Sequence, residues 1–474
     1  MTESATGSDQ QRRKALEGNL RRFILFRLFY SARFYYPVFT VLFLDYGLTL
    51  EQFSILNIVW AVSIVCAEVP SGALADIVGR KTLVVFAGAL MVVEMALILF
   101  APTGASPWLF LMFMGNRLCS GLSEAAASGA DEALAYDSLK ELGREAHWSA
   151  LLEKNSIVVA IGFFTSMILG GLVYDPAIVN GALAWLDPDW QLAGDMIIRL
   201  PILLTTVSSV IVLVVALGMY DLDAESSTTD SAIDSGKSRW QLIVGAFQQI
   251  LQAGRWTLNH RFVLFVIIAA LALDSVGRQF VVLASEYWRA IDIPVPLFGV
   301  VGASLSLLAI VNARVSRILV HSCSPLTNFL ILSAILLVGL VGIAFAVPLW
   351  GVAFAVGTFA MMSMVQFMSS YYLNKEADSA MRATILSFKG LALNLGLALA
   401  SLLYTAWVAQ LRVGNGGNME ATSDQRTVFV QSLIAFPFYY LLLFGLIFVL
   451  ARWLIKQPDK FLHKPLAEHV DDAR

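Results

Sequence analysis

Long apolar runs separated by short polar breaks make up most of the chain. Twelve of these runs are close to the about 20 mostly apolar residues that a helix needs to cross the hydrocarbon core of a bilayer. They lie near residues 22–44, 52–75, 82–102, 108–135, 148–173, 198–220, 260–284, 297–319, 327–346, 350–373, 383–408 and 429–455. The runs lack the alternation that is typical of membrane β-strands. The pattern predicts an all-α integral membrane protein with 12 transmembrane helices in two halves of six.

One long polar segment separates the first six runs from the last six. Residues 221–238 are rich in Ser, Thr and Asp, which is typical of a flexible linker. Residues 239–256 favour an amphipathic helix at the inner membrane surface, because six apolar side chains share roughly one helical face: Trp240, Ile243, Phe247, Ile250, Leu251 and Trp256. A role of this helix beyond tethering stays open.

Five segments follow from this division of the chain. We expect a cytoplasmic N-terminal tail (1–21), an N-terminal six-helix half (22–220), a cytoplasmic linker with the amphipathic helix (221–258), a C-terminal six-helix half (259–455) and a cytoplasmic C-terminal tail (456–474). Short similarities between the halves fit the parallel repeat of a six-plus-six transporter. Arg22–Phe26 opens the first run as Arg261–Phe265 opens the seventh, and Lys154 and Lys389 hold similar places in the fifth and eleventh runs.

The composition excludes the soluble classes of protein. Hydrophobic residues make up 58% of the chain and charged residues 14%, whereas an average soluble domain is about 25% charged. A net charge of −3 offers no basic surface for nucleic acid. The three cysteines, Cys66, Cys119 and Cys323, have neither disulfide nor metal-site spacing. We therefore expect the lipid bilayer as surroundings, no nucleic-acid partner, no metal, and a monomer.

The orientation follows from the lysines and arginines. With the N-terminus inside, the inner segments carry twenty-one of them and the outer segments only Arg289, Arg412 and Arg426. Because such residues concentrate in cytoplasmic loops, we expect a multi-pass protein of the inner (plasma) membrane with both termini in the cytoplasm.

The break between the second and third runs contains a recognisable motif, Gly72-Ala73-Leu74-Ala75-Asp76-Ile77-Val78-Gly79-Arg80-Lys81. Its glycines permit close helix contact and a tight turn, and Asp76 at a helix end can pair with Arg80 or with a helix N-terminus. We expect a latch between the inner helix ends, formed by Gly72, Asp76, Gly79, Arg80 and Lys81. The string is similar to the G-x-L-a-D-r-x-G-r-k signature of the major facilitator superfamily.

Other parts of the chain resemble that superfamily less completely. Ile77 replaces the usual arginine of the signature, so one partner of the latch is absent. Arg117-Leu118-Cys119-Ser120-Gly121 is similar to the R-x-x-x-G pattern, whose arginine is associated with proton coupling in several members. The glycine motif of the proton antiporters keeps Gly162, Gly170 and Gly171 but has Ser166-Met167 in place of Gly-Pro, which argues against drug/proton antiport. The strings AEVPSGALAD, SGADEALAYDSL and RATILSF resemble a subgroup of bacterial permeases without an assigned substrate.

Ionisable residues inside the apolar runs are functional candidates, because a buried charge costs several kcal/mol unless it is paired or hydrated. At about 1.5 Å per residue, Arg33 and Arg117 fall near mid-membrane. Glu124 follows on the same helical face as Arg117, nearer the cytoplasm. Asp274 and Arg278 form an i,i+4 pair in the seventh run.

The resemblance implies that the first, fourth, seventh and tenth spans line a central cavity. On those spans we expect a substrate cavity formed by Arg33, Arg117, Arg278, Gln366 and Tyr371, and proton coupling by Arg117, Glu124 and Asp274. Glu124 is the first candidate for the proton carrier, with Arg117 tuning its pKa, and Asp274 is the second. The arginines favour an anionic or zwitterionic substrate. The nearby carboxylates weaken this inference, because they repel an anion. In the alternative interpretation, the same charges form internal salt bridges that hold the spans together.

Other acidic residues receive structural roles. Glu68 lies on the inner side of the second run, and Glu94 in the third run is expected to pack or to form a local ion pair. Asp131, Glu132 and Asp137 end the fourth run, and we expect them to pair with Arg80, Lys81 or Arg144 in the latch.

The preferred hypothesis is a secondary active transporter of a small molecule that works by alternating access and is coupled to protons, with the direction open. The sequence has no G-x-x-x-x-G-K-[ST] loop, which excludes ATP as the energy source. We expect no enzyme activity, no catalytic residue and no cofactor. Two alternatives remain: a transport-inactive sensor or scaffold on the same fold, and a membrane-embedded enzyme, for which no cluster of His, Asp or Ser is present.

Overall fold

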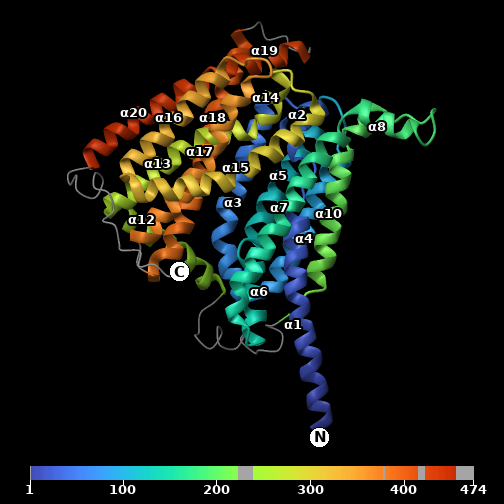
Figure 1. Cartoon of the computed structure of the whole chain (residues 1–474), viewed down its shortest axis with the longest axis vertical. Coiled ribbons are helices and arrows are strands. Elements are labelled where there is room, and N and C mark those ends of the chain that lie inside the picture. The colour runs from blue at the N-terminus through green and yellow to red at the C-terminus, as the bar shows by residue number, and fades with distance from the viewer. Residues whose placement is uncertain (1, 222–238, 377–378, 415–421, 455–474) are drawn as a thin grey trace. The chain divides into compact units, whose positions relative to one another are not determined.

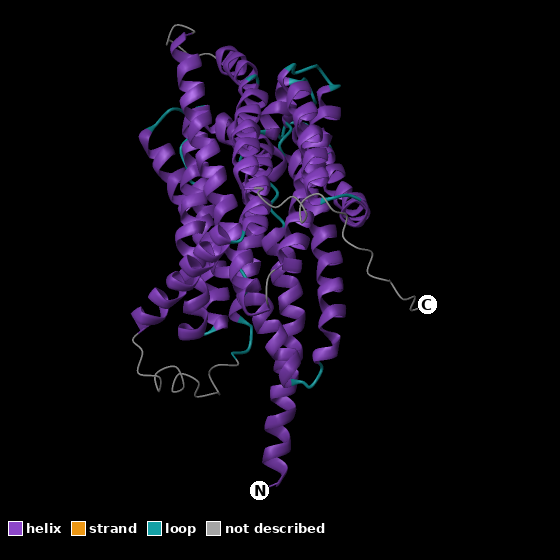
Figure 2. Ribbon diagram, turned by 90° about the vertical axis from the view of Figure 1, so that its left-hand side faces the viewer, coloured by secondary structure: helices purple, strands orange, loops and turns teal. Residues whose placement is uncertain are grey.

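The computed structural model describes residues 2–221, 239–376, 379–414 and 422–454 (Figure 1). Every regular element in those ranges is an α-helix or a short 3-10 helix, and none of them is a strand (Figure 2). The prediction of an all-α protein is therefore confirmed. The predicted C-terminal tail, and the predicted linker from residue 222 to residue 238, lie outside the described residues.

The described helices form two compact units. The first unit comprises Met1–Leu48, Val59–Gln248 and Val295–Ala303, and the second comprises Thr49–Ile58, Gln249–Pro294 and Ser304–Arg474. Each unit thus contains one short segment from the sequence of the other half. An ion pair holds Thr49–Ile58 in the second unit, because the Arg412 guanidinium donates two hydrogen bonds to the Glu51 carboxylate, at 2.6 and 2.8 Å.

The first unit is built around the packing of α4 against α5 and α10, and of α1 against α6, α7 and α10. Its elements are α1 (Thr2–Ser31), η1 (Tyr36–Val38), α2 (Phe39–Tyr46), most of α3 (Leu50–Val78), α4 (Arg80–Leu99), α5 (Pro107–Ala127), α6 (Ala130–Glu141), η2 (Glu145–His147), α7 (Trp148–Val173), α8 (Pro176–Ala184), α9 (Gly194–Ile197) and α10 (Leu200–Leu217). Small side chains such as Ala87, Ala126 and Ala216 let these helices approach closely around the fully buried Phe26 and Met91.

The second unit is built around α13, which packs against α16, α17, α18 and α20. Its elements are the end of α12 (Arg239–Asn259), α13 (Arg261–Val282), α14 (Ala284–Ala290), α15 (Val295–Ser322) after residue 303, α16 (Pro325–Ala344), α17 (Gly351–Glu376), α18 (Ser379–Gly414), α19 (Thr422–Leu433) and α20 (Ala435–Leu454). Most of α13 is enclosed by its neighbours, so its side chains face protein on several sides.

Ten of the described helices are long and apolar enough to cross a membrane. They coincide with the predicted runs except for the first and the fourth. The first run is broken, because α1 ends at Ser31, α2 begins at Phe39, and η1 with Pro37 lies between them. The fourth run falls on α5 and α6, which Gly129 separates with a φ of 78°. The membrane fold is thus observed, and the count of 12 spans stays a prediction.

Two segments outside the spans are helical. The predicted N-terminal tail belongs to α1, which begins at Thr2 and continues without a break into the first apolar run. A helix, α12, is present where an amphipathic helix was predicted after the linker, and its position at the inner membrane surface stays a prediction. Phe247, Leu251 and Leu258 leave 42, 66 and 64% of their surface exposed, as expected of a helix with an apolar face.

A close approach between α3 and α5 depends on Gly121. A Cβ atom at this position would lie 2.7 Å from the Cβ of Ser63, 2.9 Å from the carbonyl oxygen of Trp60 and 3.2 Å from the amide nitrogen of Ile64. Two of these neighbours are backbone atoms of α3, which cannot rotate away. The helix pair therefore requires a residue without a side chain here.

We predict that Gly121→Ala lowers the unfolding free energy by about 1–3 kcal/mol, as expected when a packed interior receives an extra carbon. The matched control is Gly181→Ala in α8, where a Cβ would meet nothing within 4 Å; the better helix propensity of alanine should leave that variant as stable as the wild type or slightly more so. Thermal unfolding of the purified protein in detergent measures both. Equal midpoints for the two variants would contradict the packing argument.

Candidate functional site

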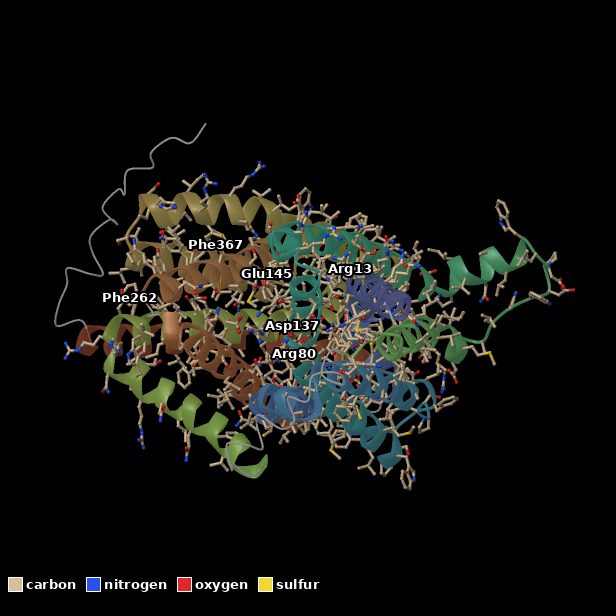
Figure 3. The ribbon with its side chains drawn as sticks, turned by 90° about the horizontal axis from the view of Figure 1, so that it is seen from below. Arg13, Arg80, Asp137, Glu145, Phe262 and Phe367 are labelled. Carbon is tan, nitrogen blue, oxygen red and sulfur yellow. The ribbon has the colours of Figure 1, made fainter. Side chains whose placement is uncertain are left out.

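The motif between α3 and α4 joins α4 to α6. Gly79, with a φ of 88°, makes the turn between the two helices. The next residue, Arg80, forms an ion pair with Asp137 (Figure 3) and donates a hydrogen bond to the carbonyl of Ala133 at 3.3 Å. The pairing of Arg80 with an acidic residue at the end of the fourth run is therefore confirmed.

The remaining residues of the predicted latch are placed as follows. Lys81 is half-buried in the first turn of α4 and has no ion pair with any described residue. Gly72 and Asp76 lie in α3, but their side chains fall outside the described part of the chain. The latch as a whole stays a prediction, of which the turn at Gly79 and the contact of Arg80 are observed.

A second arginine holds two further acidic residues of α6, Asp131 and Glu132. Asp131 and Glu132 pair with Arg27 of α1, and the Arg27 Nη2 atom donates to their carboxylates at 3.0 and 2.8 Å. The prediction that Asp131 and Glu132 pair with Arg80, Lys81 or Arg144 is therefore wrong. Arg144 instead lies 3.7 Å from Glu17. The position of Arg27 inside the first apolar run was the signal that could have identified it.

Arg33 lies in the break of the first run and is almost fully buried. Its guanidinium forms an ion pair with Glu94 of α4, which is completely buried, and lies over the rings of Tyr30 and Tyr36 at 5.3 and 5.9 Å. Of the two roles predicted for Glu94, packing or a local ion pair, the structure shows an ion pair, with a partner 61 positions away in the sequence. The charge of Arg33 is thus balanced within the first unit.

The open backbone of this break is also satisfied inside the unit. The amide of Phe34 donates a hydrogen bond to Thr205 Oγ1 of α10 at 3.0 Å. A Cβ atom on Gly170 of α7 would overlap the carbonyl of Phe34, so this glycine of the incomplete antiporter motif serves helix packing. Non-helical backbone is tolerated at membrane depth where protein surrounds it.

Arg117 in α5 is buried without an acidic partner. Its Nε atom donates to Asn116 Oδ1 at 3.2 Å, and its guanidinium lies over the rings of Phe39 and Phe43 at 5.0 and 5.3 Å. No carboxylate of the described residues forms an ion pair with it. Aromatic faces attract a cation, but they leave its formal charge uncompensated.

Glu124 lies two helical turns beyond Arg117 and is exposed. It lies within electrostatic range of Glu68 of α3. The first unit thus brings Glu68 and Glu124 near one another, and Arg117 forms its contacts with the aromatic pair instead. The expected tuning of Glu124 by Arg117 stays a prediction.

The second unit contains a polar cluster where α13, α17 and α18 meet. Asp274 pairs with Arg278 at 2.6 Å and accepts a hydrogen bond from Gln366 Nε2 at 3.1 Å. Arg278 also donates to Asn394 Oδ1 at 3.0 Å. Asp274 is completely buried, whereas the Arg278 side chain keeps 22% of its surface exposed. The structure therefore confirms the predicted pair of Asp274 and Arg278 and adds Gln366 to it.

Lys389 of α18 completes this cluster. Its Nζ atom lies 3.0 Å from Ser370 Oγ and 3.4 Å from both Ser369 Oγ and Gln366 Oε1, so its nearest partners are neutral oxygens. Sequence reasoning noted Lys389 only as the counterpart of Lys154. Its position in the middle of an apolar run was the signal that could have identified it. We call Asp274, Arg278, Gln366, Lys389 and Asn394 the Asp274 cluster.

Tyr371 is not part of the Asp274 cluster. Its ring contacts those of His321 and Tyr372, with centroids 5.9 and 5.5 Å apart. Within the described residues, no group of three or more His, Cys, Asp or Glu side chains is arranged to hold a metal ion.

Membrane-length helices that bury ion pairs in their interiors are typical of a multi-pass membrane protein with a functional polar interior. The family model of the Major Facilitator Superfamily matches residues 23–401, and the chain belongs to that superfamily. It is a secondary active transporter of a small molecule rather than an enzyme, as the sequence predicted.

Solved transporter structures share the fold at low sequence identity. A bacterial homolog of the human lysosomal transporter Spinster has a TM-score of 0.62 and 13% identity, over 94% of this chain and 98% of that chain. The nucleoside transporter NupG has a TM-score of 0.66 and 12% identity, over 94% and 99%. A D-xylose-proton symporter has a TM-score of 0.57 and 12% identity, over 95% and 98%. No curated protein sequence matches the chain.

We predict that Glu94→Gln destabilises the protein by about 3–5 kcal/mol, because it leaves the buried Arg33 without its counter-charge. The double variant Arg33→Gln with Glu94→Gln should recover most of this loss. The matched control is Glu141→Gln, which removes a half-exposed partner of Arg12 and should change the unfolding free energy by about 0–1 kcal/mol.

Thermal unfolding of the three variants measures the contribution of the pair to stability. Transport assays of the double variant then show whether the pair is needed for function. If Glu94→Gln unfolds at the same temperature as Glu141→Gln, Arg33 does not depend on Glu94. A stable double variant that transports like the wild type would remove Arg33 from the substrate site.

Proposed function

We propose that the protein is a proton-coupled transporter of a small molecule with an anionic group, and that the Asp274 cluster binds both the anion and the proton. The single observation that carries this proposal is the charge count of the cluster. Two cations, Arg278 and Lys389, surround one carboxylate, Asp274. Lys389 supplies the excess positive charge, and its Nζ atom donates hydrogen bonds to neutral oxygens of Gln366, Ser369 and Ser370.

Electrostatics then couples the two ions. With Asp274 ionised, the two cations are half neutralised and Arg278 is engaged by the carboxylate. Protonation of Asp274 releases Arg278 and raises the net charge of the cluster from one to two, which favours an incoming anion. By thermodynamic linkage, a bound anion favours the protonated carboxyl to the same extent. A proton and an anion therefore bind more tightly together than apart, which is the requirement for symport.

Asp274 is a stronger candidate for the proton carrier than Glu124, which we had ranked first from the sequence. The support is its burial and its place between Arg278 and Gln366. Glu124 is exposed, and the nearby cation Arg117 is engaged with aromatic rings. We retain Glu124, Arg117 and Arg33 as a second group of candidates in the first unit.

Relatives with the same fold support proton coupling only by analogy. One of the solved structures is a D-xylose-proton symporter, so the fold accommodates that chemistry. We further propose that the protein acts as a monomer in the plasma membrane with both termini in the cytoplasm and without a nucleic-acid partner. The excess of lysine and arginine on one side of the spans supports that orientation.

We predict that proteoliposomes containing the wild-type protein acidify when an anionic substrate is added outside, and that Asp274→Asn abolishes this proton flux. A pH dye inside the vesicles reports the flux, and the probes are succinate, inorganic phosphate and glucose 6-phosphate, with glucose as a neutral counterpart. Lys389→Gln should raise the KM of the active anion roughly 10- to 100-fold, since a hydrogen bond to a charged group contributes about 1.5–3 kcal/mol.

Two controls make this test specific. Lys375→Gln removes an exposed lysine from the last turn of α17 and should leave transport unchanged, whereas Glu124→Gln compares the two candidate carriers directly. Proton flux that survives Asp274→Asn but not Glu124→Gln would move the coupling site to the first unit. Binding of an anion without any flux would favour a sensor on the transporter fold.

A further inference from the structure

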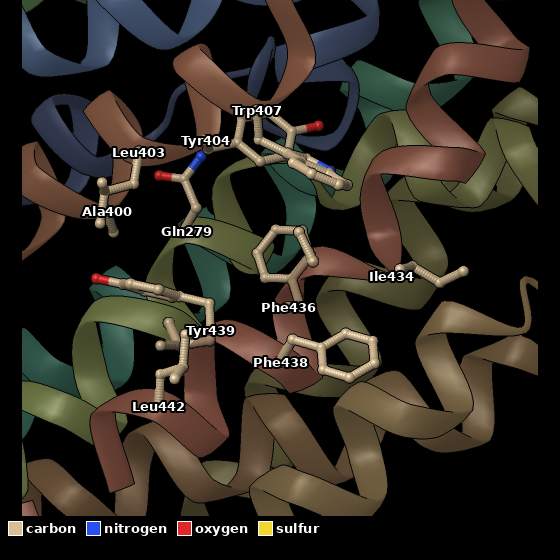
Figure 4. A pocket seen from close by; sticks show the side chains of 12 residues that line it. Gln279, Ala400, Leu403, Tyr404, Trp407, Ile434, Phe436, Phe438, Tyr439 and Leu442 are labelled. Atoms are coloured by element: carbon tan, nitrogen blue, oxygen red, sulfur yellow. The ribbon is translucent and has the colours of Figure 1, made fainter. Parts of the chain in front are cut away.

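A second site lies in the second unit, between α13, α18 and the junction of α19 and α20 (Figure 4). It is a cavity of about 360 Å³, within the range of about 300–1,000 Å³ that is typical of small-molecule sites. Aromatic rings dominate its walls, contributed by Tyr404 and Trp407 of α18 and by Phe436, Phe438 and Tyr439 of α20. None of its lining residues belongs to the Asp274 cluster.

The local sequence explains why space remains between these helices. The last span is interrupted at Ile434, where α19 ends and α20 begins. Pro437 lacks a backbone N–H, and its ring conflicts with a regular helix around residue 433. The wall of the cavity also contains two small side chains, those of Ala400 and Ala435, which leave space between the helices unfilled.

Two hydrogen-bond donors of the cavity wall have no partner. Gln279 is 2% exposed, and its Oε1 atom accepts a hydrogen bond from Ser401 at 2.6 Å, but its Nε2 atom has no acceptor. The buried Nε1 atom of Trp407 has none either. A buried donor without a partner is unfavourable, so both atoms suit a ligand that brings an acceptor.

The mouth of the cavity is apolar. Leu403, Ile434, Phe438 and Leu442 border it and keep 44, 50, 65 and 75% of their surface exposed. These residues belong to the membrane-length helices Thr384–Gly414 and Gln425–Gly445. Exposed apolar side chains on membrane spans face the acyl chains of lipid, so a ligand reaches this cavity from the bilayer.

We propose that this cavity binds a hydrophobic, ring-containing compound that carries a carbonyl-type acceptor and enters from the membrane. The rings stack against the aromatic walls, and the acceptor receives hydrogen bonds from Gln279 Nε2 and Trp407 Nε1. The site disfavours charged molecules, since none of the described residues that line it carries a charge. The site is separate from the one proposed for the anion, and neither proposal depends on the other.

Photolabelling of the full-length protein in lipid nanodiscs with benzophenone tests this proposal, because benzophenone is itself a hydrophobic aromatic ketone that inserts into neighbouring C–H bonds on illumination. We expect the label on the peptides that contain Tyr404, Trp407 and Phe436–Tyr439. Ala400→Phe should abolish it by filling the cavity, and Leu402→Phe, at an exposed position of α18 outside the cavity, should not.

The acceptor is tested separately by competition. Fluorenone should displace benzophenone about tenfold better than fluorene, which has the same rings without the carbonyl; tenfold corresponds to about 1.4 kcal/mol. Gln279→Leu should reduce this preference. If Ala400→Phe does not fold, Leu403→Trp at the mouth replaces it. Label spread evenly over exposed helices such as α16, or label unchanged in the filled variants, would overturn the site, and equal competition by fluorene would overturn the assigned chemistry.

Discussion

The cost of placing a charge among apolar helices governs how this protein is built. An ionised group without a partner loses its hydration and gains little in return. The chain meets this constraint in the same way in each unit, by pairing a cation with a completely buried carboxylate: Arg33 with Glu94 in the first unit and Arg278 with Asp274 in the second. Each unit also contains a buried cation that forms no ion pair with a described carboxylate, Arg117 in the first and Lys389 in the second. These two residues carry the uncompensated charge from which a transport site can be made.

The two unpaired cations are held by different chemistry, and the difference bears on their use. Arg117 lies over Phe39 and Phe43, whose ring faces hold a planar guanidinium in a fixed position. Lys389 has a compact ammonium surrounded by the hydroxyls of Ser369 and Ser370 and the amide of Gln366. An anion can replace the neutral oxygens around Lys389 without moving a large side chain, whereas an anion that reaches Arg117 has to displace the rings of Phe39 and Phe43. The second unit is therefore better suited to binding and releasing an ion, and the first to a lasting arrangement.

The sequence predicted the helices well because hydropathy is a local property. The run 148–173 coincides with α7 at both ends, and the i,i+4 pair of Asp274 and Arg278 was foreseen because one helix fixes its geometry. The break after Ser31 was not predicted, since residues 22–44 are mostly apolar and the local signs of a break are limited to Ser31, Arg33 and Pro37.

Contacts between distant parts of the chain were predicted less well. Glu94 was assigned a local ion pair, but its partner Arg33 lies 61 positions away. Arg27 was not among the predicted partners of the acidic residues in α6, although it pairs with both Asp131 and Glu132. Lys389 could be recognised as unusual in its apolar run, but only the packing of α13, α17 and α18 identifies its neighbours. Such pairings depend on which helices meet, and hydropathy alone does not specify that.

Helix α13 connects the two sites of the second unit through its own periodicity. At about 100° per residue, Asp274 and Arg278 lie within about 40° of each other, whereas Val276 and Gln279 point to the opposite side of the helix. One face of α13 thus carries the ion pair and the other forms a wall of the aromatic cavity. The site proposed for the anion and the site proposed for the hydrophobic compound thus share one helix. If α13 moves as a rigid element during transport, both sites move with it, and the two ligands influence each other's affinity to the same extent.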